Sequence, residues 1–332
     1  MLMVRGVQVK VKRIGNGPII SPSTHTSIGK NIQGPSLIRA PDWIKPRLGN
    51  YYLYFADHKG HYIRLAYVNK LQGTWTVHPP GSLQLENSHF PIEPPKVNDK
   101  LLEQIKTRAQ NNGIDLNKLP HDLVTEFTTP HIASPDVHVD SENKRIIMYF
   151  HGLQDFARQV SRVALSEDGI SFQALPDIIG KTYMRIFKHN SFTYAMAMPG
   201  QFYRSLDGLT SFDEGPLLFN SNMRHSALLV RGDYLYVFWT QVGDTPERIL
   251  LSTMDITGDW MQWVESEVVE VLRPEETWEG ADAPLEPSVR SVAYGHVNQL
   301  RDPAVYVEND RAFLLYAVAG ESGIALVELI FD

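Results

Sequence analysis

The sequence predicts an all-β protein folded as a five-bladed β-propeller. Three observations predict it: a hairpin that recurs along the chain, a short apolar run before each hairpin, and an alternating N-terminal run that supplies a strand missing from the last unit. Hydrophobic residues make up 43% of the 332 residues, which is enough for a sizeable core. We expect one domain that spans residues 1–332.

The repeated unit is a pair of apolar runs around a polar loop. Four of the five copies close with a turn and an aromatic residue, as in "SEDGISF" and "SLDGLTSF". The Asp-Gly pair indicates a tight turn, because glycine adopts a positive φ without steric cost. The five copies occupy residues 50–75, 145–172, 191–212, 233–260 and 311–331.

A short run that could form an inner strand precedes each hairpin. Five units of three or four strands in a fixed order are typical of a propeller rather than of a sandwich. The five runs occupy residues 34–41, 134–140, 183–190, 225–232 and 302–309.

The ring needs one more strand, because the last unit stops after its third. The N-terminal run "VQVKVKRI" (7–14) alternates between apolar and polar residues, and we expect it to complete the last blade. The alternative is an ordinary edge strand in another sheet.

Two insertions interrupt the repeat, at residues 81–130 and 273–297. The first contains "NDKLLEQIKTRAQNNG", which predicts a helix capped by Asn98 or Asp99 with Gly113 just past its end. Long loops in compact domains are usually functional or disordered. Trp278, Glu279 and Glu286 favour a functional role for the second insertion.

Composition excludes several classes of protein. The net charge of −7 and the lack of a dense basic run argue against nucleic acid as a partner. With no cysteine, the chain has neither disulfides nor cysteine nucleophiles. Neither a signal peptide nor a membrane span is visible, so we expect a soluble cytoplasmic protein, or a periplasmic or secreted one if a leader has been removed. Motifs of nucleotide-binding folds, HExxH metalloproteases and GxSxG hydrolases are absent from the sequence.

Residues at the start of the inner strands should face the central channel. Asp136, His225 and Asp302 would then occupy equivalent places in three of the five blades. Converging carboxylates raise each other's pKa, which suits acid/base catalysis. The alternative is that each Asp beside a proline caps the local backbone and that His225 is structural. By alignment, the channel positions are Ser36, Asp136, Arg185 or Tyr183, His225 or Ser226, and Asp302.

Loops after the second strand of each blade provide a second group of candidates. Asp57, His58 and His151 stand at matching offsets, where they could contact sugar hydroxyls or an ion; solvated loop residues are the alternative. Gln241, Asp244 and Glu321 lie in the corresponding loops. Four arginines follow these loops and could pair with a substrate carboxylate: Arg64, Arg158, Arg162 and Arg248.

Three segments carry a family resemblance: "GPSLIRAP…NYYLYFADHKGHYIRLAYVNKLQGTW", "SPDVHVDSENKRIIMYFHG" and "LRDPAVYVENDRAFLLYAVAG". The chain resembles the five-bladed propeller glycoside hydrolases of family 43 and the related families 32, 68, 117 and 130. The resemblance covers all five units, about four-fifths of the chain. Its motifs are specific for the fold and only weakly specific for an activity.

The resemblance implies hydrolysis by two carboxylates, with a third Asp that tunes pKa and orientation. Asp136 matches the modulating Asp of the second blade, and Asp302 matches the Asp of an "RDP" motif in the last blade. The position of the first-blade base is held by Gly34, and that of the fourth-blade acid by the region of His225. Either Asp57, Glu279 or Glu286 replaces the missing groups, or hydrolysis has been lost.

Our leading hypothesis is a glycosidase that acts on an oligosaccharide in the axial pocket. Asp136 and Asp302 would be the catalytic carboxylates, and His225 the acid or an orienting group. The expected substrate contacts are Asp57, His58, His151, Arg185, Trp278 as a stacking platform, and Glu286.

Two alternatives stay open. One is a sugar-binding propeller without catalysis, and the other is a metal-assisted hydrolase of a lactone or phosphoester. His58, His151 and His225 are the candidate metal ligands. We expect no required cofactor, although a structural calcium or other divalent ion in the channel fits the same residues.

Overall fold

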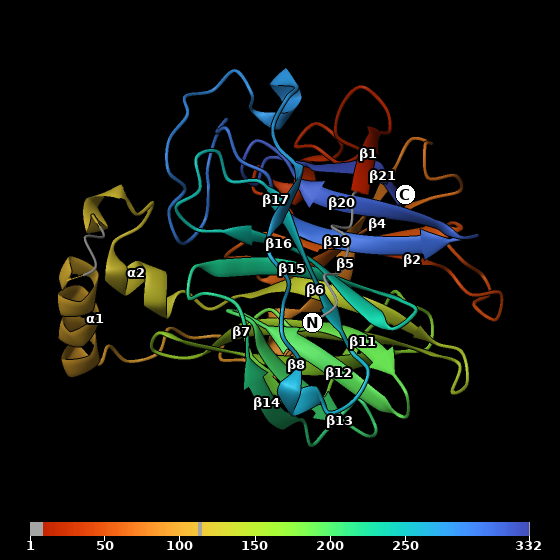
Figure 1. Ribbon diagram of the computed structural model, residues 1–332, viewed down its shortest axis with the longest axis horizontal. Helices are drawn as coiled ribbons and strands as arrows, with labels where there is room; N and C mark the ends of the chain where they lie inside the picture. The colour runs from red at the N-terminus through yellow and green to blue at the C-terminus, as the bar shows by residue number, and fades with distance from the viewer. Residues whose placement is uncertain (1–8, 112–114, 332) are drawn as a thin grey trace.

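The computed structural model describes residues 9–111 and 115–331. Within them the chain forms five antiparallel sheets, each with four strands on its main path, and two α-helices. This arrangement confirms the predicted five-bladed propeller (Figure 1). In the same residues, no helix is long and apolar enough to cross a membrane.

Each blade begins with its innermost strand and proceeds outward along the chain. The first blade is β2 (Gln33–Arg39), β3 (Tyr51–Ala56), β4 (Tyr62–Val68) and β5 (Thr76–Gln84). The second is β6 (Ile132–Asp140), β7 (Arg145–Asp155) and β8 (Arg158–Ser166), with the short β9 (Gln173–Ala174) and β10 (Gly180–Lys181) both paired to β8. The third is β11 (Arg185–His189), β12 (Phe192–Ala197), β13 (Gln201–Ser205) and β14 (Asp213–Leu217). The fourth is β15 (Met223–Arg231), β16 (Tyr234–Gln241), β17 (Ile249–Asp255) and β18 (Val269–Leu272).

The last blade joins the two ends of the chain. It consists of β19 (Arg301–Glu308), β20 (Arg311–Ala317), β21 (Ile324–Phe331) and β1 (Val9–Arg13). Strand β1 pairs antiparallel with β21, from Val9 opposite Phe331 to Arg13 opposite Val327, and the red and blue strands lie side by side in Figure 1. The predicted closure by the N-terminal run is therefore confirmed.

Apolar side chains fill the spaces between neighbouring blades. Residues 9–111 and 115–331 form five buried clusters, one for each adjacent pair of blades. The cluster between the first two blades, for example, joins Tyr52, Tyr54 and Leu65 to Met148 and Phe150. Burying one such side chain stabilises the fold by about 1.5–3 kcal/mol, so the blades hold one another in place around the axis.

The Asp-Gly turns form as expected. Oδ1 of Asp168 accepts hydrogen bonds from the backbone N–H groups of Ile170 and Ser171, and Gly169 has a φ of +68°. Asp207 does the same for Leu209 and Thr210, and Gly208 also has a φ of +68°. The repeated Asp-Gly sequence thus corresponds to one turn geometry that occurs in both blades.

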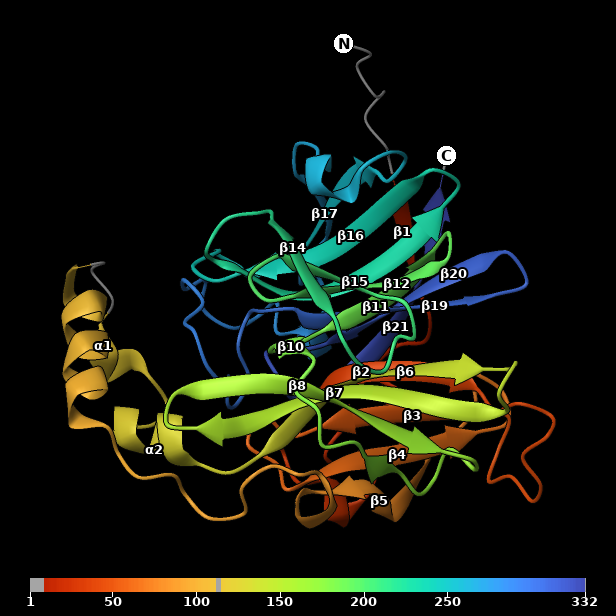
Figure 2. The same ribbon diagram turned by 90° about the horizontal axis from the view of Figure 1, so that it is seen from below.

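The first insertion forms an arm that projects from the propeller (Figures 1 and 2). It contains α1 (Asp99–Asn111) and α2 (Leu123–Thr128). Asn98 caps α1, because its Oδ1 accepts from the N–H of Leu101; the predicted Gly113 lies outside the described residues. His121 of this insertion touches Tyr294 of the second one, with Nε2 3.1 Å from the tyrosine Oη.

Candidate active site

A ring of strained residues stands where the inner strands begin. Four inner strands carry a shift in register near their start, and a residue with positive φ lies at or beside each shift. The third blade has its positive-φ residue just before β11. The φ values are +60° at Gly34, +50° at Ser134, +62° at Tyr183, +45° at His225 and +49° at Asp302. Non-glycine residues in this region cost about 1–3 kcal/mol each and cluster at functional sites.

This ring corrects the alignment of the two aspartates. Ser134, not Asp136, is the counterpart of Asp302, since a proline follows each of Gly34, Ser134 and Asp302. Asp136 lies two residues further along its strand, opposite Tyr149. The two carboxylates therefore do not occupy equivalent places.

The axial channel is divided into two cavities. The first, of about 520 Å³, is lined by the ring residues Ser134, Tyr183, His225 and Asp302; we call it the Asp302 cavity. The second, of about 720 Å³, is lined by residues further along the inner strands, including Asp136 and His138; we call it the Asp136 cavity. They lie at opposite ends of the inner strands, so the expected pairing of Asp136 with Asp302 in one pocket is wrong.

Arg185 separates the two cavities. Its buried guanidinium donates from Nη1 to the carbonyls of Ser134 and Pro135 at 3.1 and 3.0 Å, and from Nε to the carbonyl of Ser226 at 3.1 Å. It also lies 4.2 Å from the centre of the Tyr183 ring. Arg185 thus ties three blades together and lines the Asp136 cavity, where we expected a substrate contact in the same pocket as Asp302.

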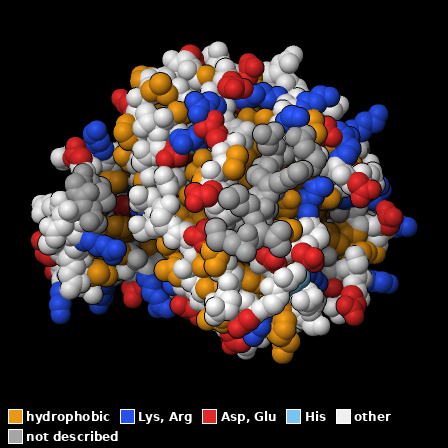
Figure 3. Space-filling model, in the orientation of Figure 1, with side chains coloured by type: hydrophobic (Ala, Val, Ile, Leu, Met, Phe, Trp, Pro, Cys, Tyr) orange, Lys and Arg blue, Asp and Glu red, His pale blue; other side chains and the backbone are white. Residues whose placement is uncertain are grey.

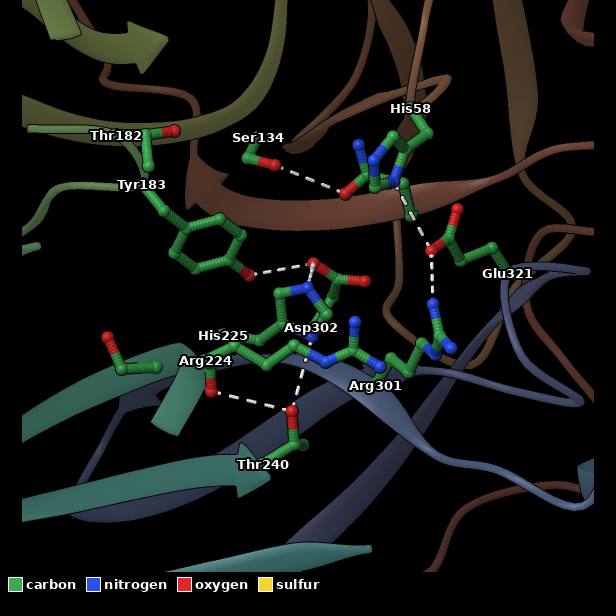
Figure 4. Close-up of polar contacts among 12 residues, drawn as sticks. His58, Ser134, Thr182, Tyr183, Arg224, His225, Thr240, Arg301, Asp302 and Glu321 are labelled. Atoms are coloured by element: carbon green, nitrogen blue, oxygen red, sulfur yellow. Dashed lines mark hydrogen bonds and ion pairs between the residues drawn. The ribbon is translucent and has the colours of Figure 1, made fainter. Parts of the chain in front are cut away.

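Asp302 is the ring carboxylate on the floor of the Asp302 cavity. Tyr183 donates its hydroxyl proton to Oδ1 of Asp302 at 2.9 Å, and Nε2 of His225 lies 3.8 Å from the same oxygen (Figure 4). Within the described residues, the buried Oδ2 has no hydrogen-bond partner. Burial and the nearby charge of Glu321 raise the pKa of Asp302 to about 6. A group with these properties can hold a proton near neutral pH and deliver it to a ligand.

Glu321 and His58 stand beside this carboxylate. Arg301 donates from Nη1 to Oε1 of Glu321 at 2.8 Å, and Nδ1 of His58 lies 3.4 Å from the same oxygen (Figure 4). Burial opposes ionisation of Glu321, but His58, Arg301 and Asn31 outweigh it and hold its pKa below the usual range. Glu321 is therefore an anion that orients His58, and His58 lines the cavity.

His225 and His151 are neutral members of the same wall. Burial and the charges of Arg224 and Arg301 keep the pKa of His225 well below its usual value. Its Nδ1 lies 3.2 Å from Oγ1 of Thr240. Burial lowers the pKa of His151 to about 3, and among the described residues its Nδ1 has no partner.

The histidines do not form the expected metal site. His58, His151 and His225 all line the Asp302 cavity. Among residues 9–111 and 115–331, however, no group of three or more His, Asp or Glu side chains is placed to hold a metal ion. In this structure the predicted ligand set is therefore not assembled, although all three rings line the same cavity.

A steric contact accounts for the missing first-blade base. A Cβ added to Gly34 would come within 2.8 Å of the Cα of Ser134. No side chain fits there without moving the neighbouring blade. The second blade presents only the hydroxyl of Ser134, which donates to Oε1 of Gln33 at 3.2 Å.

Three other predicted site residues lie outside the Asp302 cavity. Asp57 pairs with Arg64 at 3.2 Å and accepts from the N–H of Lys59, so it holds its own loop. Trp278 is half-buried and packs against the apolar cluster between the last two blades. Glu286 is exposed. None of the three lines the Asp302 cavity, so the structure does not place them as substrate contacts there, and these roles stay predictions.

The carboxylate of Glu279 is fully engaged in hydrogen bonds that hold the structure together. Its carboxylate accepts from Arg13 at 2.9 and 2.8 Å and from the hydroxyl of Tyr316 at 2.7 Å. It also accepts from the backbone N–H groups of Glu275 and Glu276. It therefore anchors the second insertion to the last blade, and it cannot also serve as the replacement base.

Sequence reasoning missed several residues that build the site. The sequence places Glu321 in a loop without assigning it a role, and it gives no signal that Glu126 of α2 lines the cavity. The buried pair of Arg224 and Glu247, 2.9 Å apart from Nε to Oε1, supports the wall next to His225. The prolines at 35, 135 and 303 are the signal that could have placed the ring correctly.

Comparison with solved structures supports the fold. The chain has the five-bladed propeller fold that is also found in family 43 glycoside hydrolases, which confirms the resemblance at the level of the fold. It is similar to CoXyl43, a β-xylosidase/α-arabinofuranosidase from a compost microbial metagenome in complex with xylotriose, with a TM-score of 0.56 and 12% identity over 97% of this chain and 94% of that one. It is also similar to the GH43_1 enzyme from Xanthomonas citri complexed with xylotriose, with a TM-score of 0.54 and 11% identity over 95% and 88%. At these identities the likeness shows the fold alone.

A closer relative defines the family. The chain belongs to the same family as Uncharacterized protein R118 of Acanthamoeba polyphaga mimivirus, to which it is 36% identical over 321 residues, covering 89% of this chain and 82% of that protein. No family model matches the chain.

Proposed function

We propose that the chain is a glycoside hydrolase that cleaves an oligosaccharide in the Asp302 cavity. The observation that carries this proposal is Asp302 itself: a buried carboxyl with a pKa raised to about 6 and an unpartnered oxygen, on the floor of a cavity in a glycoside hydrolase fold. A buried carboxyl whose pKa is raised toward neutral pH is the usual proton donor to a glycosidic oxygen.

His58 is the proposed base. Its Nδ1 faces the anionic Glu321, which leaves Nε2 to accept a proton from water. In the reaction, Asp302 donates its proton to the glycosidic oxygen as the bond from that oxygen to the anomeric carbon breaks. The water oxygen bonds to the anomeric carbon and its proton passes to His58, and exchange with solvent restores both groups.

The neighbouring groups position Asp302. The hydroxyl of Tyr183 donates to Oδ1 of Asp302, so the unpartnered Oδ2 is the oxygen that can reach a substrate. His225 is neutral and contacts Asp302 and Thr240, which suits an orienting role better than that of a cationic acid.

A second candidate is a sugar-binding propeller without catalysis. It is favoured by the ring, in which Gly34 has no room for a side chain and Ser134 offers a hydroxyl in place of a carboxylate. The same unpartnered atoms of Asp302 and His151 would then accept or donate hydrogen bonds to sugar hydroxyls.

Product analysis separates the two candidates. The wild-type protein and Asp302→Asn are incubated with a panel of neutral and acidic oligosaccharides, and released sugars and binding are measured in parallel. The hydrolase predicts products with the wild-type protein only and binding with both proteins. If both proteins bind and neither releases products, the hydrolase is contradicted and the non-catalytic sugar-binding propeller is favoured.

A further inference from the structure

The Asp302 cavity holds more positive charge than acid/base chemistry requires. Two carboxylates line it, Asp302 and Glu126, and Glu126 is offset by Lys59 at 3.3 Å. Among the cations that line it, Lys181 lies 3.6 Å from Glu214. The remaining lining cations are Arg158 and Arg290, together with Arg224, whose charge is shared with Glu247 behind the wall.

Arg224 and Arg290 face the same space with donors to spare. Arg224 donates from Nε and Nη2 to Glu247, and no hydrogen bond among the described residues uses its Nη1. Arg290 donates from Nη2 to the carbonyl of Ser221 at 3.2 Å and has no ion-pair partner within the same residues. Burial and the charge of Arg224 lower the pKa of Arg290, in keeping with two guanidinium groups close together.

Arg158 adds a third cation on the same cavity. It lies at the start of β8, and its side chain has no hydrogen-bond or ion-pair partner in residues 9–111 and 115–331. Like charges gathered in one cavity repel one another, and an anion placed between them removes that cost.

We propose that the Asp302 cavity selects a carbohydrate that carries an anionic group, bound between Arg224 and Arg290. A uronate carboxylate, a sulfate ester and a phosphate ester share the chemistry that two guanidinium groups recognise. This inference rests on the proposed function, because it takes the sugar ring to lie against Asp302.

The rest of the cavity wall supports this placement. The arm contributes apolar side chains, among them Ile105, Leu123 and Phe127, to the side of the cavity. Apolar surroundings lower the local dielectric constant and strengthen a charge-assisted contact. Oδ2 of Asp302 and Nδ1 of His151 remain as hydrogen-bonding partners for the hydroxyls of the sugar.

Calorimetric titration tests the preference independently of turnover. The Asp302→Asn variant is titrated with neutral xylotriose and with trisaccharides that carry one uronate, one sulfate or one phosphate. At least one anionic probe should bind about tenfold or more tightly than the neutral one, and raising the salt should shrink that difference. The three anionic arms identify which group is recognised.

A second substitution locates the anion. Adding Arg290→Gln should weaken binding of the preferred anionic probe by about tenfold to a hundredfold and leave neutral binding unchanged. Arg39→Gln is the matched control, because Arg39 lines the Asp136 cavity. The side chain of Arg290 still reaches solvent although neighbouring atoms partly surround it, so its replacement should leave the fold intact.

The outcomes are distinct. Neutral and anionic probes of equal affinity, no anionic binding, or an unchanged preference in Arg290→Gln would overturn the anion site. Anionic binding that depends on Arg290, together with no turnover by the wild-type protein, would instead contradict the hydrolase and leave the anion site standing.

Discussion

The two ends of the axial channel hold two aspartates with opposite electrostatics, the partly buried Asp136 and the fully buried Asp302. Asp136 accepts from the N–H of Ile186 and from Nε2 of His138, both at 2.8 Å. Burial opposes its ionisation, but His138 and Arg185 outweigh burial and lower its pKa. Asp302 has an unpartnered oxygen, and burial with Glu321 raises its pKa. The comparison teaches that burial alone does not set the ionisation of a channel carboxylate: His138 and Arg185 lower the pKa of Asp136, whereas burial and Glu321 raise that of Asp302.

Replacing each aspartate separates the two ends most sharply. Asp302→Asn should lower turnover about 10²- to 10⁴-fold, because the proton donor is lost while Tyr183 can still donate to the amide oxygen. Asp136→Asn is the control and should leave turnover nearly unchanged. Steady-state rates on an oligosaccharide substrate decide it, and the reverse pattern would place the active site at the Asp136 end.

Removing the residue that divides the channel should cost stability. Arg185→Met leaves the buried carbonyls of Ser134, Pro135 and Ser226 without their donor, at about 1–3 kcal/mol each before relaxation. We expect a loss of roughly 3–5 kcal/mol in the free energy of unfolding, measured with urea.

Arg39→Met provides the comparison for that measurement. Arg39 lies at the Asp136 end and forms an exposed ion pair with Glu308, so its loss should change little. Equal small losses for the two variants would mean that Arg185 does not hold the blades together.

The pH dependence of stability should differ in sign for the two aspartates. Ionised Asp136 stabilises the fold above its unfolded pKa of about 4, and that stability is lost as pH falls through its lower folded pKa. Asp302 has the higher pKa when folded, so its contribution is present below pH 4 and is lost as pH rises through about 6.

Urea unfolding between pH 3 and 8 reads out this difference. In the wild-type protein, Asp302 should lower the free energy of unfolding by up to about 3 kcal/mol as the pH rises from 4 to 7, and Asp302→Asn should abolish this decrease. Asp136 should raise the free energy of unfolding as the pH rises through the acid range, and Asp136→Asn should abolish this increase. Parallel profiles for the two variants would contradict the opposite pKa shifts.

Trp278 gives the smallest expected effect and separates packing from binding. Trp278→Ala should cost about 2 kcal/mol of unfolding free energy, because the ring packs between the last two blades, and should leave ligand affinity unchanged. Glu286→Gln is the matched exposed control in the same insertion. A loss of affinity in Trp278→Ala without loss of stability would restore the stacking platform.

Much of the fold could be predicted because local signals repeat. The Asp-Gly turns, the alternating strands and the N-terminal run that closes the last blade each follow from short-range chemistry. Part of the cavity could be predicted too, since His58, His151, His225 and Asp302 all line it.

The rest of the site could not be predicted, because it depends on backbone geometry and on contacts between distant segments. "SPD" and "RDP" look alike, but the register shift and positive φ put Ser134, not Asp136, on the ring. The pairs of Arg224 with Glu247 and of Arg301 with Glu321 form between segments brought together only by the fold. Trp278 and Glu279 were chosen for residue type, which does not reveal that each is occupied by packing or hydrogen bonds.

The most direct test of the account is the titration of the Asp302 carboxyl, followed by infrared difference spectroscopy between pH 3 and 8. We predict a protonated-carboxyl C=O band with a midpoint near pH 6 that persists in Asp136→Asn and disappears in Asp302→Asn. A band that survives in Asp302→Asn, or an Asp302 midpoint near the ordinary value of about 4, would contradict the account.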